Sequence, residues 1–79
     1  MPTPIVAAQR YSNRGATYYY QGKYQEALRD YDRAIALESR NPKSYYGRAL
    51  TYRALGNDTA AQQDYRNSCT LGLCPKESQ

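Results

Sequence analysis

Residues 11–37 read YSNRGATYYYQGKYQEALRDYDRAIAL, and residues 45–71 read YYGRALTYRALGNDTAAQQDYRNSCTL. Shifting the chain by 34 residues aligns these two stretches and gives nine identities within one repeat length. Self-similarity at a fixed period of this size indicates a supersecondary unit stacked on a copy of itself. The identical pairs are Tyr11 and Tyr45, Arg14 and Arg48, Thr17 and Thr51, Tyr18 and Tyr52, Gly22 and Gly56, Ala27 and Ala61, Asp30 and Asp64, Tyr31 and Tyr65, and Leu37 and Leu71.

Each unit has the signals of two helices joined by a tight turn. Thr3 is a good helix cap, and Pro4 suits the first helical position, where a backbone N–H has no partner within the helix. Asn41 and Pro42 repeat this start in the second unit, and we expect Asp58 to cap the last helix. The pattern predicts four antiparallel helices. Residues that suit the ends of these helices are Gly22, Gly56, and Gly72 with Pro75.

The composition predicts an unusual core. The 79-residue chain has nine Leu, Ile and Val residues and no Phe or Trp, but it has ten Tyr and ten Ala. We therefore expect one small domain whose helices pack through Ala–Tyr contacts. The apolar runs are too short to span a membrane, and residues 5–8 are too short for the core of a signal peptide. Whether a leader was removed stays open.

This 34-residue helix–turn–helix period resembles the tetratricopeptide repeat over nearly the whole chain. The resemblance implies an all-α, right-handed α-solenoid of two units, residues 8–41 and 42–75, between an N-terminal extension (1–7) and a C-terminal tail (76–79). The family positions hold Tyr11, Gly15, Tyr18, Ala27, Tyr31 and Ala34 in the first unit, and Tyr45, Ala49, Tyr52, Ala61 and Tyr65 in the second. The departures are Arg14 and Arg48 where the family usually has leucine, Ser39 where it has proline, and Ser68 where it has alanine.

The two arginines recur with an aspartate at the same offset in each unit. Arg14 with Asp30, and Arg48 with Asp64, are placed at the contact between the two helices of one unit. We predict two ion pairs within the units, which fix helix register more than they add net stability, because partial burial of charges is costly. Binding of an anion by these arginines is the alternative.

Catalytic and cofactor chemistry has little support in the sequence. The chain has no His, and its Ser, Asp and Lys residues form no recognisable triad or carboxylate pair. Cys69 and Cys74 alone cannot complete a tetrahedral zinc site, and the glycines are dispersed rather than gathered in a phosphate-binding loop. We therefore expect a protein that is not an enzyme, without a cofactor, metal or small-molecule substrate.

The resemblance implies a concave groove lined by the first helix of each unit, which accepts peptides or partner helices. Asn13 and Lys43 match family positions that bind a terminal carboxylate, but Ala16 and Gly47 replace the further polar partners. We therefore do not expect a carboxylate clamp. The candidate groove residues are Asn13, Tyr19, Tyr20, Lys43, Tyr46 and Leu50, with Gln9, Ala16, Gly47 and Arg53 beside them.

The three groove tyrosines have two interpretations. Tyr19, Tyr20 and Tyr46 could shield the helix faces while their hydroxyls stay in water. They could also form an aromatic contact patch, because Tyr is enriched among the residues that contribute most to protein–protein binding.

A second hypothesis is self-assembly through the ends of the array. Two repeats are fewer than the three or so that such arrays usually need. Head-to-tail stacking of copies would close into a ring or propagate as a filament. The polar stretch of residues 62–67 argues against it, since this stretch could itself cap the array. The candidate self-association residues are Ile5, Val6, Tyr65, Leu71 and Leu73.

Cys69 and Cys74 form a candidate disulfide across a glycine-containing helix end. Reduced cysteines, with Met1 as the initiator, would indicate the cytoplasm, whereas an oxidised pair would indicate an extracytoplasmic or secreted protein.

The sequence thus predicts a non-catalytic module for protein–protein interaction. Its partner is a second copy of the chain, a peptide segment of another protein, or both. The net charge of +4 leaves weak binding of nucleic acid or an anionic surface as a further alternative. Nucleic acid is disfavoured because Lys43, Arg48 and Arg53 are five residues apart and turn by about 140° at each step around a helix.

Overall fold

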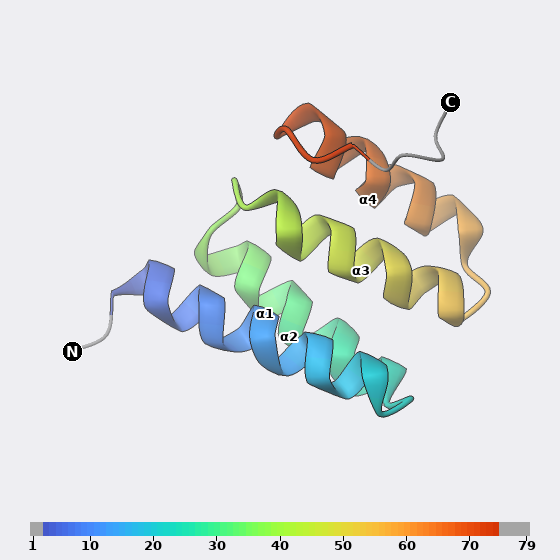
Figure 1. Cartoon of the computed structure of the whole chain (residues 1–79), viewed down its shortest axis with the longest axis horizontal. Coiled ribbons are helices and arrows are strands. Elements are labelled where there is room, and N and C mark those ends of the chain that lie inside the picture. The colour runs from blue at the N-terminus through green and yellow to red at the C-terminus, as the bar shows by residue number, and fades with distance from the viewer. Residues whose placement is uncertain (1–2, 75–79) are drawn as a thin grey trace.

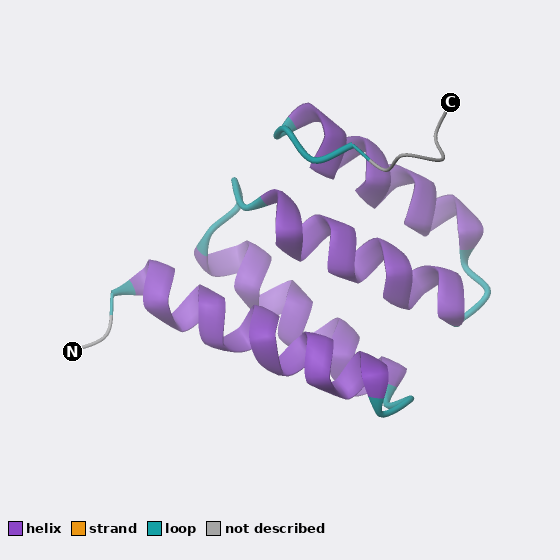
Figure 2. Cartoon of the chain, viewed as in Figure 1, coloured by secondary structure: helices purple, strands orange, loops and turns teal. Residues whose placement is uncertain are grey.

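The computed structural model describes residues 3–74, and it contains four helices and no strand within that range. The helices are α1 (Pro4–Tyr20), α2 (Tyr24–Leu37), α3 (Pro42–Ala54) and α4 (Asp58–Thr70). Helices α1 and α2 form one antiparallel hairpin, α3 and α4 form the next, and the second hairpin lies alongside the first (Figures 1 and 2). The predicted all-α helical-repeat solenoid is therefore confirmed.

The helix starts follow the capping residues, with one correction. Thr3 Oγ1 accepts a hydrogen bond from the backbone N–H of Val6 at 3.2 Å, and Asn41 caps α3 in the same manner. The prediction of Asp58 as the cap of α4 was wrong by one residue, because Asn57 caps the helix and accepts from Ala60 N at 3.2 Å. Either side chain makes a good cap, and an aspartate just inside the helix still faces its positive end.

The predicted glycine ends are confirmed, since Gly22, Gly56 and Gly72 have φ angles of +78°, +83° and +110°. Each lies in the left-handed region that side chains with a Cβ rarely adopt. The residue after each glycine donates its backbone N–H to the carbonyl of the residue that lies four positions before the glycine, at 2.8–2.9 Å. The expected role of Pro75 lies outside the described residues.

Small residues and one tyrosine form the core. Ala27, Ala34 and Ala49 are fully buried, and Tyr31 of α2 is 5% exposed. A methyl group at Gly15 of α1 would come within 3.2 Å of the Tyr31 ring, and one at Gly47 of α3 would overlap it. The Tyr31 ring therefore joins the two repeats, because it packs against the first helix of each.

Gly47, expected beside the groove residues, lies against the Tyr31 ring and is half-buried. A second link between the repeats is the contact of Ser12 Oγ with Ser44 Oγ at 2.6 Å, which connects α1 to α3.

None of the helices within residues 3–74 is long and apolar enough to cross a bilayer.

Candidate protein-interaction surfaces

Each repeat contains the same arginine–aspartate pair. Arg14 Nε and Nη2 donate to Asp30 at 2.7 and 3.0 Å, and Arg48 Nε and Nη2 donate to Asp64 at the same distances. The two aspartate side chains are only 5% and 3% exposed. Hydrogen bonding to Asp30 raises the pKa of the Arg14 guanidinium, and hydrogen bonding to Asp64 does the same for Arg48. These pairs hold the two helices of each repeat together.

The two arginines differ at their outer edge. Arg48 Nη1 donates to Asp32 Oδ1 at 2.8 Å, so Arg48 binds one carboxylate from its own repeat and one from the repeat before it. Arg14 makes no such second ion pair within residues 3–74, and its side chain is 57% exposed against 20% for Arg48. From the sequence we did not identify Asp32 as a partner of Arg48. The spacing is the same on both sides, because Asp32 lies 16 residues before Arg48 and Asp64 lies 16 residues after Arg48.

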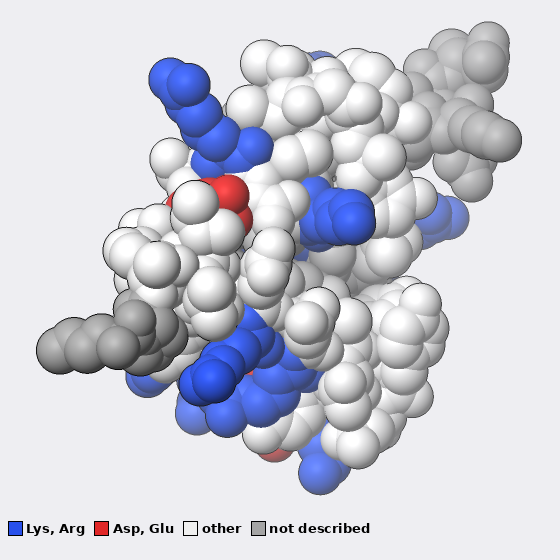
Figure 3. Space-filling view, turned by 60° about the vertical axis from the view of Figure 1, so that its left-hand side comes forward, with Lys and Arg blue, Asp and Glu red and all other residues white. Residues whose placement is uncertain are grey.

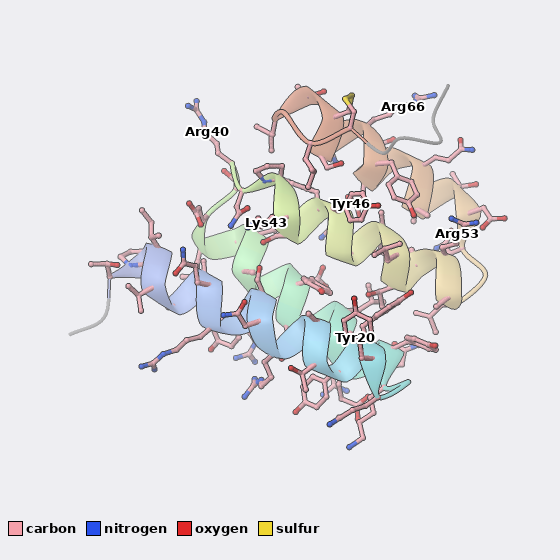
Figure 4. The ribbon with its side chains drawn as sticks, viewed as in Figure 1. Tyr20, Arg40, Lys43, Tyr46, Arg53 and Arg66 are labelled. Carbon is pink, nitrogen blue, oxygen red and sulfur yellow. A yellow bond between two sulfur atoms is a disulfide. The ribbon has the colours of Figure 1, made fainter. Side chains whose placement is uncertain are left out.

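We define the groove face by the candidate groove residues of α1 and α3, namely Asn13, Tyr19, Tyr20, Lys43, Tyr46 and Leu50. Tyr20 projects from the end of α1 toward α3, and Lys43, Tyr46 and Arg53 follow one another along α3 (Figure 4). Tyr20 is 83% exposed, the Asn13 and Lys43 side chains are exposed, and Leu50 is half-buried. The structure thus places three tyrosines and Lys43 on this face.

Ring contacts hold the groove tyrosines in place. Tyr19 packs edge-on against Tyr20, with ring centroids 5.3 Å apart, and lies 5.6 Å from Tyr24 of α2. Tyr46 packs edge-on against Tyr65 of α4 at 5.7 Å. Tyr65 thus supports a groove residue, and its place among the self-association residues stays a prediction.

Charge is segregated between the helices. Helices α1 and α3, both of which lie wholly within the described residues, carry cations and no carboxylate. The cations are Arg10, Arg14, Lys43, Arg48 and Arg53, and the carboxylates within residues 3–74 are Glu26, Asp30, Asp32, Glu38, Asp58 and Asp64, on α2, α4 and the loop after α2. Of these cations only Lys43 is a groove-face residue, because Arg14 and Arg48 are paired with aspartates and Arg10 lies with Arg14 at a hollow described below. From the sequence we considered the net charge of +4, whereas assigning each charged residue to its predicted helix would have shown that α1 and α3 have no carboxylate.

The two ends of the array expose small apolar areas. Ile5 and Val6, in the first turn of α1, are 53% and 42% exposed. At the other end Leu73 is 37% exposed and Leu71 is half-buried. The Sγ atoms of Cys69 and Cys74 are joined in a disulfide that closes the turn after α4. No cluster of metal-ligating side chains occurs in the part of the chain that the structure describes.

A hollow lies against the first half of α1. Ala7, Arg10, Tyr11 and Arg14 line it, and its volume is about 400 Å³. Arg14 and Arg33 both place their guanidinium carbons 5.6 Å from the centre of the Tyr11 ring. Arg33 Nη1 also donates to the Tyr11 hydroxyl at 3.4 Å. We refer to these five residues as the outer α1 site.

Two stacked helical hairpins, joined through small residues and one tyrosine, define a class of non-catalytic repeat modules that bind other proteins. Residues 15–56 match a family model described as TPR repeat, and residues 42–71 match one described as tetratricopeptide repeat. The chain belongs to the tetratricopeptide-repeat family.

Relatives with this similarity include serine/threonine-protein phosphatase 5 of human, rat and mouse. Each is 44% identical over 55 residues, which cover 70% of this chain. The chain spans 11% of the length of these phosphatases, so the match does not transfer their enzymatic activity. No solved structure matches the chain.

Proposed function

We propose that the chain is a non-catalytic adaptor that binds an acidic segment of another protein on its groove face. The exposed cation Lys43 supports this proposal, together with the absence of any carboxylate on α1 and α3, the two helices that line the face. Opposite charge steers a partner to the surface and disfavours partners of the wrong sign.

The aromatic residues supply the apolar part of the interaction. Tyr20 exposes most of its ring, and Tyr46 is fixed by its contact with Tyr65. A fixed tyrosine ring adds contact area and loses little conformational freedom on binding. The bound segment should therefore combine Asp or Glu with at least one apolar or aromatic side chain.

Electrostatics at the ends of the array favours this function over head-to-tail self-assembly. If a second copy continued the solenoid with the internal geometry, α4 of one copy would lie against α1 of the next as α2 lies against α3. Arg66 would then take the place of Asp32, and Arg14 the place of Arg48. Two like charges would meet where the internal interface has an ion pair, and this costs binding energy.

Steric fit between the two ends also disfavours head-to-tail self-assembly. In the internal interface the Tyr31 ring requires glycine at position 47, where a methyl group would overlap it. The corresponding residues between copies are Tyr65 and Asn13, so the site that must be glycine would carry an asparagine side chain. Stacking of copies through Ile5, Val6, Leu71 and Leu73 would need a different geometry from the one inside the chain.

A peptide-display selection tests the adaptor function. The immobilised full chain is offered a library of random 12-residue peptides, and the enriched sequences are synthesised for fluorescence anisotropy. We expect enrichment of Asp and Glu next to an apolar or aromatic residue. Binding should weaken about tenfold in Tyr20→Ala and Tyr46→Ala, the size of a typical contribution from a dominant interface residue.

A charge-matched pair of variants provides the control. Lys43→Gln removes a cation from the groove face, and Arg29→Gln removes one from the exposed surface of α2. Lys43→Gln should weaken binding of the selected peptides more than Arg29→Gln does. Peptides without acidic residues, or equal losses in the two variants, would contradict the proposal.

A further inference from the structure

The comparison of the two repeats shows an incomplete carboxylate site on Arg14. Within the chain, Arg48 binds Asp64 through Nε and Nη2 and binds Asp32 through Nη1. Arg14 uses the same two nitrogen atoms for Asp30, and the structure gives its Nη1 no carboxylate partner among residues 3–74. The chain itself thus shows which chemical group fits the outer edge of this arginine.

Further cations surround this incomplete site. Arg10 lines the hollow of about 400 Å³ together with Arg14, and the guanidinium carbons of Arg14 and Arg33 lie 5.6 Å from the centre of the Tyr11 ring. In Figure 3, Lys and Arg side chains gather beside the beginning of α1, and little acidic surface is visible there. Both the positive charge and the aromatic ring remain accessible, because Arg14 is 57% exposed and Tyr11 is half-buried.

We propose that the outer α1 site docks an acidic amphipathic helix of another protein, whose Asp or Glu binds Arg14 Nη1 as Asp32 binds Arg48. The residues of the outer α1 site are not groove-face residues, but the docked helix also reaches Asn13 at the border of the groove face. A helix is the occupant because Asp32 reaches Arg48 from helix α2, which packs directly against α3. Charge complementarity excludes a second copy in this geometry, since Arg66 would replace the aspartate.

The structure also restricts the residue before the carboxylate. Tyr31 precedes Asp32 on α2 and lies against Gly47, whereas the matching position on α1 is Asn13. A docking helix therefore carries a small residue, such as Ala, directly before its Asp or Glu. This requirement distinguishes a docked helix from a general attraction of anions.

The probe is a 14-residue capped peptide with the sequence of α2 and the change Tyr31→Ala, which supplies the small residue. Its matched control also carries Asp32→Asn. Both are titrated to millimolar concentration into the isotope-labelled full chain, because short isolated helices are marginally stable in water and bind weakly. The readouts are the Nε–Hε resonance of Arg14 and the ring resonances of Tyr11.

We expect saturable shifts at Arg14 and Tyr11, with the Asp32 peptide binding about threefold more tightly than its Asn counterpart, as for an exposed ion pair. The Nε–Hε resonance of Arg48, whose outer edge is already occupied by Asp32, should not move. A peptide that keeps Tyr31 should bind more weakly than the peptide with Ala.

Two variants keep the test independent of folding. Arg14→Gln removes the guanidinium group that binds the docked carboxylate, but it also removes the ion pair with Asp30 and can therefore affect folding. The double variant Arg10→Gln/Arg33→Gln is therefore measured as well. This double variant leaves the Arg14–Asp30 pair intact and should weaken binding about threefold. Equal affinity for the Asp and Asn peptides, shifts confined to the groove face, or unchanged binding in the double variant would each overturn the proposal.

Discussion

The first and second repeats contain the same arginine–aspartate pair, but only the second arginine is enclosed by a neighbouring repeat. Arg48 is held by carboxylates on both sides, whereas Arg14 has one carboxylate and an exposed edge. The difference shows how a repeat protein generates distinct surfaces from one sequence pattern. The same position forms an interface between repeats at Arg48 and leaves an exposed arginine edge at Arg14, where we propose a binding site.

Removal of the arginines should have the largest effect on stability. Arg48→Leu leaves the 3% exposed Asp64 without its partner, at a cost of about 3 kcal/mol in the free energy of unfolding. Arg14→Leu should cost less, because the Arg14 side chain is 57% exposed and water can replace it at Asp30. The difference between the two variants should include about 0.5 kcal/mol from the ion pair that Asp32 loses in Arg48→Leu. Urea denaturation monitored by circular dichroism measures both values.

Double variants distinguish a stranded charge from lost packing. Adding Asp64→Ala to Arg48→Leu, or Asp30→Ala to Arg14→Leu, removes the unpaired carboxylate. Each double variant should be more stable than its single variant. If removal of the aspartate instead lowers stability further, the loss in the single variant does not come from an unpaired carboxylate.

The two glycines that contact Tyr31 should respond differently to a methyl group. Gly47→Ala makes the new Cβ overlap the Tyr31 ring, so it should destabilise the chain by about 2 kcal/mol despite a better helix propensity. Gly15→Ala brings the methyl to 3.2 Å and should change stability by less than about 1 kcal/mol, since Ala49 occupies the same position in the second repeat. Thermal unfolding of both variants tests this order, and a more severe loss at Gly15 would contradict it.

Stability should also fall at alkaline pH because of Tyr31. Burial raises the pKa of this tyrosine from 10.0 to about 12, so the unfolded chain loses the proton at a lower pH than the folded chain does. The free energy of unfolding therefore decreases as the pH rises from about 10 to about 12.

Tyr31→Phe should reduce that decrease, because it removes the titrating hydroxyl. Tyr65→Phe is the matched control, as it changes the same position of the second repeat, where the ring is half-buried. Urea denaturation at several pH values gives the slopes. An unchanged slope in Tyr31→Phe would show that other groups cause the loss.

The smallest expected effect concerns Asp32, whose side chain is 56% exposed. Asp32→Asn should destabilise the chain by about 0.5 kcal/mol and leave the Arg48–Asp64 pair in place. Arg29→Gln, on the same helix, provides a surface control. A loss above about 2 kcal/mol would mean that the contact between repeats depends on this ion pair far more than its exposure implies.

The sequence alone predicted the helices, the glycine turns and the family, because these depend on local signals and on a period of 34 residues. It could not show that Tyr31 packs between Gly15 and Gly47, since that contact joins three helices. Nor could it show that Tyr65 packs against Tyr46, because that contact depends on how α3 and α4 pack against each other. The surfaces follow from packing between repeats, which a one-dimensional pattern does not contain.

The central claim is that the two ends of this array do not fit each other and that its cationic surfaces bind foreign acidic segments. The most direct measurement is the molar mass of the full chain by light scattering over a concentration series at physiological salt, with and without reductant. The account predicts a monomer of 9.0 kDa at every concentration. Growth into rings or filaments would contradict it and would make Ile5, Val6, Leu71 and Leu73 the functional surface.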